Sequence, residues 1–202
     1  IMTAPALVMV GMGSTDARVA QVAHSLRQGL QSMRPGLSVH CAFLDHCSPS
    51  TAQVVSQLIK QGITEVVLVP LQLTHAIDPD ERVIGQSVKL RSLYPDLRVS
   101  VSRPVGPEVT LLTVLDQRLR ASLSAQRVLE LDGLVLSSAR SGDVRGNALL
   151  ARRARQWSTH HRLPCLTAVA DGSGPSVAQA IQGLRAQGRE LENPVVAAER
   201  GA

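Results

Sequence analysis

The sequence predicts an α/β fold in which parallel strands alternate with helices. Short runs rich in Val, Leu and Ile alternate with stretches whose apolar residues recur at helical spacing. The chain has only one Phe, one Tyr and one Trp, so its core has to be built from aliphatic side chains. Such a core suits buried parallel strands covered by helices. With 202 residues and 44% hydrophobic content, the chain can form one domain or two small ones.

Four strand–helix units are predicted in the first part of the chain. The strands fall at 6–10, 37–45, 65–73 and 97–102, and the helices at 16–33, 50–62, 78–94 and 107–124. The third helix has the clearest start signal, since Asp78-Pro79-Asp80-Glu81 places an aspartate cap before a first-turn proline. Four such units in a row indicate a doubly wound domain, which we place at residues 1–125.

The pattern then begins again, which indicates an internal duplication. Residues 134–145 (LVLSSARSGDVR) repeat residues 7–18 (LVMVGMGSTDAR), and residues 174–179 (GPSVAQ) repeat residues 48–53 (SPSTAQ). The match ends after Gln187-Gly188, where a third strand should follow. We therefore expect a linker near residues 124–132 and a truncated second repeat, strand–helix–strand–helix, over 132–202.

Composition and charge narrow the class of protein. The formal net charge is +5 and the sequence pI is about 9.8, mostly from arginine, which favours carboxylate or phosphate partners. Scarce aromatics argue against single-stranded nucleic-acid binding, and no apolar run is long enough to span a membrane. Three cysteines without a CxxC pattern do not form a disulfide framework, so we expect a cytoplasmic protein.

Three motifs together carry a resemblance to a known family. They are the first strand entering Gly11-Met12-Gly13-Ser14, the second strand ending in Asp45 before Pro49-Ser50, and the third strand running through Val69-Pro70-Leu71 into a polar loop. With the duplication, the chain resembles the sirohydrochlorin chelatases, the class II tetrapyrrole chelatases. The resemblance implies a tandem of Rossmann-like parallel-sheet domains, of which the second is incomplete here.

The family resemblance also implies an activity. Its members are lyases that insert Co²⁺, Fe²⁺ or Ni²⁺, as substrate and without an organic cofactor, into a carboxylate-rich tetrapyrrole for cobalamin or sirohaem synthesis. The resemblance therefore implies an anionic tetrapyrrole as partner, and a homodimer is possible. The rival hypothesis is an inactive paralogue that binds tetrapyrrole or metal, or supports a partner enzyme. A second rival is an unrelated phosphate or nucleotide binder that uses the same glycine turn.

The family's site residues can be carried over one at a time. The turn histidine of the family falls on Met12, which can neither accept a proton nor bind hard divalent ions well. The acid falls on Asp45, and the loop histidine falls on Asp78, with His75 three residues earlier as a substitute. We therefore predict His75 and Asp45 as catalytic residues and metal ligands, with Asp78 as a weaker ligand. The predicted substrate-binding residues are Gly11, Met12, Gly13, Ser14 and Arg140.

Several of these residues have a simpler structural interpretation. The glycine turn can hold an anion or serve only as a strand-to-helix turn capped by Ser14 or Asp16. Asp78 suits a helix cap better than a ligand, and His75 can be a solvated loop residue. His46 is the neighbour best placed to join Asp45. His160 and His161 close an arginine-rich helix, where solvation is the better account of them.

Overall fold

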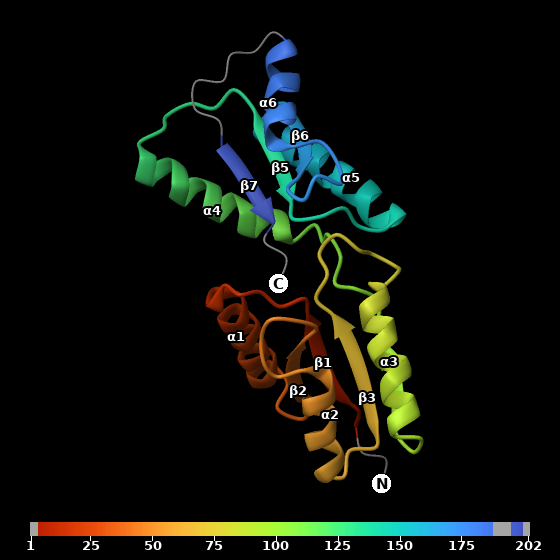
Figure 1. The fold of residues 1–202 in the computed structure, drawn as a ribbon. Coiled ribbons are helices and arrows are strands. Elements are labelled where there is room, and N and C mark those ends of the chain that lie inside the picture. Colours follow the sequence, from red (N-terminus) through yellow and green to blue (C-terminus); the bar gives the residue numbers. More distant parts are fainter. Residues whose placement is uncertain (1–3, 188–194, 200–202) are drawn as a thin grey trace. The chain divides into compact units, whose positions relative to one another are not determined.

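A computed structural model describes residues 4–187 and the backbone of residues 195–199. Strands and helices alternate along the chain, as predicted (Figure 1). The chain divides into two compact units. Of the described residues, the first contains those up to Gln72 together with Ile77–Val105, and the second contains Leu73–Ala76 and those from Gly106 onward.

The first unit is built on a four-stranded parallel sheet with the strand order β2-β1-β3-β4. The chain passes from β1 to β2 on one side and then to β3 on the other side of β1, so the carboxyl ends of β1 and β3 form the type of edge where such sheets bind ligands. Its elements are β1 (Ala6–Gly11), α1 (Ala17–Met33), β2 (Ser38–Phe43), α2 (Thr51–Lys60), β3 (Glu65–Pro70), α3 (Glu81–Leu93) and β4 (Arg98–Val101).

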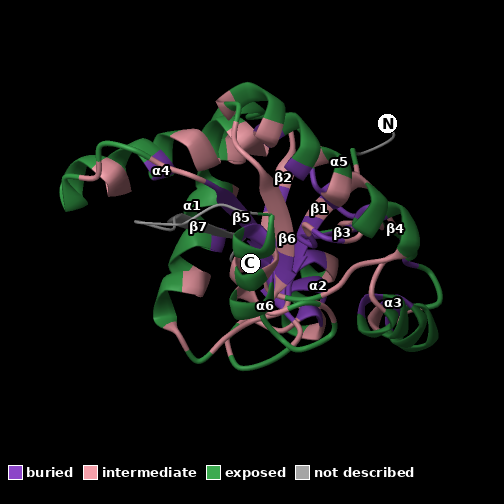
Figure 2. Ribbon diagram, turned by 90° about the horizontal axis from the view of Figure 1, so that it is seen from above, coloured by how far each residue is buried: buried purple, intermediate pink, exposed green. Residues whose placement is uncertain are grey.

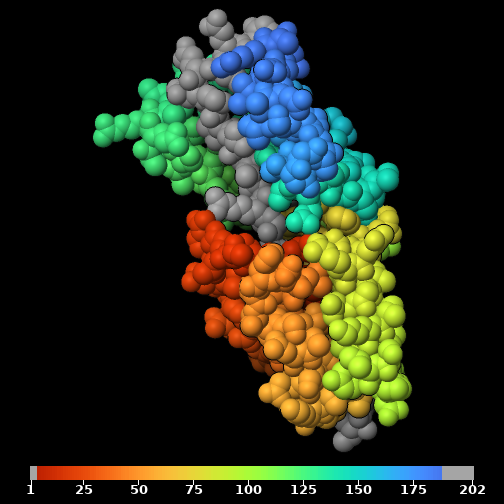
Figure 3. Space-filling model, in the orientation of Figure 1, coloured from red at the N-terminus to blue at the C-terminus, as the bar shows by residue number. Residues whose placement is uncertain are grey.

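Apolar side chains cover both faces of this sheet. Val8 and Val10 of β1 pack with residues of α2 and α3, whereas Met9 between them packs with residues of α1. This alternation is the two-residue period of a strand buried on both sides. On the side seen in Figure 3, α2 and α3 cover the sheet, and Figure 2 shows the burial concentrated on the strands.

The third helix begins two residues later than Asp78 predicts. The N-cap is Asp80, whose carboxylate accepts a hydrogen bond from the Arg82 amide at 2.8 Å. The Asp80 amide donates to the side chain of the buried Gln72 at 2.9 Å, which holds the cap in place. Pro79 therefore precedes the cap instead of occupying the first turn, and the predicted capping role of Asp78 is wrong.

The second unit contains a three-stranded parallel sheet with the order β6-β5-β7. The third strand corrects the prediction that this repeat stops after its second helix. Gly188, which closes the sequence match, lies outside the described residues. The elements are α4 (Leu111–Gln126), β5 (Leu134–Ser138), α5 (Val144–His161), β6 (Cys165–Val169), α6 (Val177–Ala186) and β7 (Val195–Glu199).

Helix α4 belongs to the second unit, although it precedes the predicted linker. Leu119 of α4 is buried in one cluster with Leu134 of β5 and Trp157 of α5, and the leucines at 112, 115 and 123 pack against the same cluster. These positions recur at three- and four-residue spacing, so one face of α4 is apolar. The division between the compact units thus lies at residues 105 and 106, before α4.

The two repeats share local contacts as well as sequence. The Ser14 amide lies 3.4 Å from Cys47 Sγ in the first unit, and the Ser141 amide lies 3.1 Å from Ser173 Oγ in the second. Asp16 and Asp143 cap α1 and α5, and Ser50 and Ser176 form capping boxes at the starts of α2 and α6. Contacts repeated at equivalent positions support a duplication.

Candidate functional site

The turn after β1 lies directly against the end of β2. The Asp45 amide donates to the Met12 carbonyl at 3.1 Å, and the Leu44 amide donates to the Gly11 carbonyl at 2.9 Å. Gly13 has φ +84°, and a Cβ atom at this position would lie 1.8 Å from the Asp45 carbonyl oxygen. Only glycine fits here, because both the conformation and the close approach exclude a side chain.

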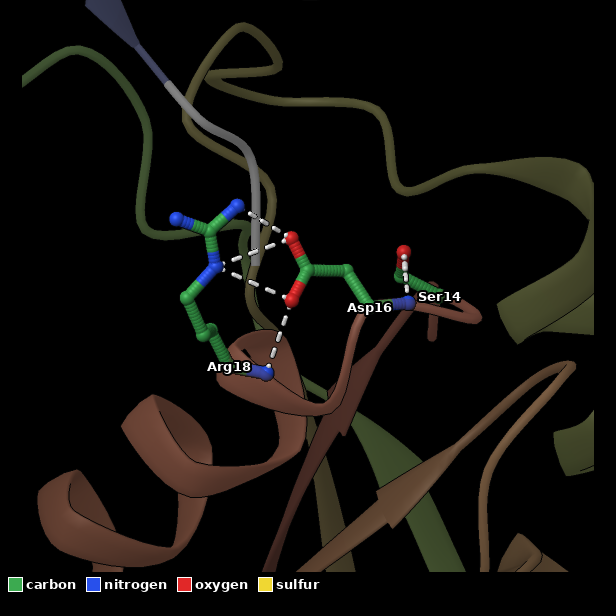
Figure 4. Close-up of polar contacts among 3 residues, drawn as sticks. All are labelled: Ser14, Asp16 and Arg18. Carbon is green, nitrogen blue, oxygen red and sulfur yellow. Dashed lines mark hydrogen bonds and ion pairs between the residues drawn. The ribbon is translucent and has the colours of Figure 1, made fainter.

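The residues that follow this turn cap helix α1. Figure 4 shows the Asp16 carboxylate accepting hydrogen bonds from the Arg18 amide at 3.0 Å and from Arg18 Nη2 at 2.7 Å. The Asp16 amide donates to Ser14 Oγ at 3.0 Å. The cap interpretation of the turn is therefore confirmed. A negative charge already sits at the positive end of the α1 dipole, which makes this helix end a poor anion site.

A carboxylate and an imidazole stand together at the end of β2. Asp45 Oδ2 lies 3.5 Å from His46 Nε2, and Asp45 Oδ1 accepts a hydrogen bond from the His46 amide at 2.9 Å. His46 adopts φ 63°, a left-handed conformation that turns the chain back. Both side chains are exposed, at 63% and 51%. The prediction that His46 joins Asp45 is confirmed, and the pair can bind a metal ion or accept a proton.

Arg82 is a neighbour of the turn that sequence reasoning missed. Its Nη2 lies 3.5 Å from Met12 Sδ, and its Nε lies 3.3 Å from the Asp80 carboxylate. Residues at the second position of a capped helix often reach back to the cap. With Asp80 recognised as the cap of α3, the sequence would have placed Arg82 at the second position of the helix, close to the cap. The guanidinium supplies a positive charge beside Met12, which suits a carboxylate-rich ligand.

Of the other two predicted ligands, Asp78 lies in the same unit as Asp45 and His75 lies in the other unit. Asp78 is exposed in the first unit, in the loop before α3. His75 is half-buried in the segment Leu73–Ala76, which belongs to the second unit. There the Ala76 amide donates to the Asp143 carboxylate at 3.0 Å.

The second unit has a different set of side chains at the equivalent position. Asp171 corresponds to Asp45, but Gly172, with φ 84°, stands where His46 does. Hydrogen bonds from Ser173 lower the pKa of Asp171, and the charge of the exposed Arg140 adds to this effect. The predicted substrate-binding residue Arg140 therefore lies near a carboxylate in its own unit. The first repeat therefore has a carboxylate followed by an imidazole at this position, Asp45-His46, and the second repeat has Asp171-Gly172.

No helix in the described part of the chain is long and apolar enough to cross a membrane.

Comparisons with known proteins agree with this architecture. The chain is 25% identical over 115 residues to a sirohydrochlorin ferrochelatase of Bacillus subtilis, covering 57% of this chain and 44% of that protein. It is 28% identical over 72 residues to a sirohydrochlorin cobaltochelatase of Methanopyrus kandleri, covering 36% of this chain and 50% of that protein. The chain thus spans about half the length of these relatives.

Solved structures share the fold. SirB from Bacillus subtilis with Fe³⁺ superposes with a TM-score of 0.69 at 19% identity, covering 89% of this chain and 70% of that one. The sirohydrochlorin chelatase SirB from Bacillus subtilis subspecies spizizenii in complex with cobalt superposes with a TM-score of 0.70 at 18% identity, covering 96% of this chain and 86% of that one. These likenesses establish the chelatase-like α/β fold. The CbiX family model matches residues 6–122, more than half of the chain, and the protein belongs to the CbiX family.

Proposed function

We propose that this protein is a sirohydrochlorin chelatase that inserts Co²⁺ or Fe²⁺ into the tetrapyrrole for cobalamin or sirohaem synthesis. The observation that carries the proposal is the Asp45–His46 pair beside the Gly11–Ser14 turn at the carboxyl end of a parallel sheet. Support also comes from membership of the CbiX family and from relatives named as sirohydrochlorin ferrochelatase and cobaltochelatase.

The reaction sets two chemical demands on the residues. The metal needs ligands that release it readily, such as imidazole with carboxylate, and a base must accept the two protons that leave the pyrrole nitrogens. Asp45 and His46 supply one carboxylate and one imidazole within 3.5 Å of each other. The roles of His75 as proton acceptor and ligand, and of Asp78 as a weaker ligand, remain predictions that substitution tests.

The substrate carries many carboxylates, so its binding needs positive charge. Arg82 presents a guanidinium 3.5 Å from Met12 Sδ, at the turn itself. We propose that the turn Gly11–Ser14 shapes the floor on which the tetrapyrrole lies and that Arg82 pairs with a substrate carboxylate. Arg140 is proposed as a second counter-charge. We expect the protein to be cytoplasmic and to form a homodimer, and sedimentation velocity tests the dimer.

The decisive experiment compares two equivalent aspartates. Sirohydrochlorin and Co²⁺ are mixed anaerobically with the protein, and metallation is followed by absorbance against the protein-free rate. We expect the protein to accelerate metallation and Asp45→Asn to reduce that acceleration about 100-fold, the usual loss when a general base is removed. Asp171→Asn is the matched control, because the same residue type stands there beside Gly172, and it should keep the full rate.

The histidines are then tested separately. His46→Ala and His75→Ala each report whether that imidazole contributes to metallation. If the tetrapyrrole spectrum shifts on binding but metallation is not accelerated, the protein is a non-catalytic binding protein and the chelatase proposal is wrong. Equal rates in wild type, Asp45→Asn and Asp171→Asn would remove the assignment of the site to the end of β2.

A further inference from the structure

A second group of metal-ligating side chains lies where α4 meets the C-terminal end of α5. Asp116 Oδ1 lies 2.7 Å from His161 Nε2, and Asp116 Oδ2 lies 3.5 Å from His160 Nε2. The sequence favoured solvation of both histidines, which is wrong for His161. Its side chain is only 21% exposed and that of Asp116 17%, whereas His160 is 61% exposed.

The single tryptophan of the chain fixes the carboxylate. Trp157 is 1% exposed, and its Nε1–H donates to Asp116 Oδ1 at 2.6 Å. Partial burial acts to raise the pKa of Asp116, but hydrogen bonds from Trp157 and His161 and the charges of both histidines outweigh it and lower the pKa. The carboxylate is therefore ionised at neutral pH, and Trp157 serves as the kind of supporting hydrogen-bond donor found behind metal ligands.

The arrangement has the composition and spacing of a transition-metal site. One nitrogen or oxygen from each of Asp116, His160 and His161 lies within 4.8 Å of the others, and this is the one such group among the described residues. Tetrahedral ligands at about 2.0–2.1 Å from zinc are about 3.4 Å apart, so small side-chain rotations close the site. Two imidazoles and a carboxylate suit Zn²⁺ and Co²⁺ and do not suit Mg²⁺.

We propose that Asp116, His160 and His161 form a binding site for Zn²⁺ or Co²⁺, separate from the chelatase site. The site lies wholly within the second unit and needs no tetrapyrrole, so it goes beyond the proposed function. His160 also lines an open groove with Arg152, Arg155, Gln156 and Thr159. Water or an anion from this groove completes the coordination. The two exposed arginines weaken cation binding, so we expect micromolar affinity.

Trp157 provides a direct readout of this site. Its ring centroid lies 5.7 Å from that of His161, and no other tryptophan contributes to the fluorescence. We expect low micromolar Co²⁺ to quench the fluorescence of the full chain, because Co²⁺ bound this close to an indole deactivates its excited state. Zn²⁺, with a filled d shell, should bind without comparable quenching and should displace Co²⁺, which restores the signal.

Three single variants locate the bound ion. His160→Ala removes an exposed side chain, so the fold is kept, and the Co²⁺ concentration for half-quenching should rise at least 10-fold. His161→Ala should do the same, with its fold checked by circular dichroism. His24→Ala, an exposed histidine of α1 in the first unit, is the control and should leave the midpoint unchanged. Absence of quenching by micromolar Co²⁺, or the same midpoint in all four proteins, overturns the proposal.

Discussion

At the scale of single residues, the most informative position is Met12. It stands where the resemblance places the turn histidine of the chelatases, and its thioether cannot accept a proton. The Arg82 guanidinium, 3.5 Å from Met12 Sδ, sets the electrostatics of any side chain placed there. An imidazole beside this positive charge stays neutral at pH 7, which is the form needed for metal binding and for proton acceptance.

We therefore predict that Met12→His increases the rate of sirohydrochlorin metallation by about 10-fold or more, given the usual contribution of a positioned base. The measurement is the anaerobic absorbance assay with Co²⁺. Ala139 occupies the equivalent position of the second repeat, so Ala139→His is the matched control and should leave the rate unchanged. A rate for Met12→His at or below that of the wild type would show that this turn does not face the reacting centre.

A second prediction at this scale concerns Cys165. Burial raises the pKa of its thiol to about 11, against a smaller opposing effect of a backbone hydrogen bond from Leu136. Because only the thiolate reacts, we expect alkylation by iodoacetamide at pH 8 to be about 100-fold slower in the native protein than in urea. The rate should rise with pH up to about 11. Peptide mapping by mass spectrometry measures this, and equal rates in both states would contradict it.

At the scale of elements, comparing two glycines with the same φ distinguishes the cost of a left-handed backbone from the cost of a steric clash of an added Cβ atom. Gly13 and Gly62 both have φ +84°, but a Cβ at Gly13 would lie 1.8 Å from the Asp45 carbonyl oxygen, whereas at Gly62 nothing lies within 4 Å. Gly62→Ala should lower the free energy of unfolding by about 1–2 kcal/mol, the cost of a left-handed alanine. Gly13→Ala should cost clearly more, as measured by urea denaturation. Equal losses would mean that the turn moves freely away from β2.

The elements also show how far local sequence signals reach. The strands and helices of the first unit follow from apolar periodicity, because each element buries a face whose spacing is visible in the chain. The predicted start of α3 is wrong because two aspartates flank Pro79, and the Asp80 amide is held by Gln72, a contact that the local sequence does not show. Strand β7 was missed because its residues do not match the sequence of β3, although it takes the same place beside the central strand.

The candidate site was predictable only where its residues are neighbours in sequence. Asp45 and His46 adjoin each other after a strand, so their pairing could be expected. Arg82 reaches Met12 from another element, and Asp116 reaches His161 across 45 positions of the chain. Such contacts depend on how the apolar faces of helices pack. For α4 that packing places Leu119 with Trp157 and Leu134 in the second unit.

At the scale of the whole molecule, the duplication has produced two units with separate cores. Leu58 of α2 is 1% exposed in a cluster built from the first unit, and Leu184 of α6 is 0% exposed in a cluster built from the second. The two leucines occupy equivalent positions of the repeat, so one substitution can be made twice in the same local setting. If each core stabilises its own unit, the effects of the two substitutions should be confined to different parts of the chain.

We predict that Leu58→Ala lowers the stability of the first unit by about 2–5 kcal/mol and that Leu184→Ala does the same to the second, as for other buried leucines. Native-state hydrogen exchange measures this strand by strand. Leu58→Ala should speed exchange of the β1 and β3 amides and leave those of β5 and β6 unchanged, and Leu184→Ala should do the reverse. Each variant is thus the control for the other. Faster exchange in all four strands with either variant would mean that the two units unfold as one cooperative body, since a cavity in one core would then destabilise both sheets equally.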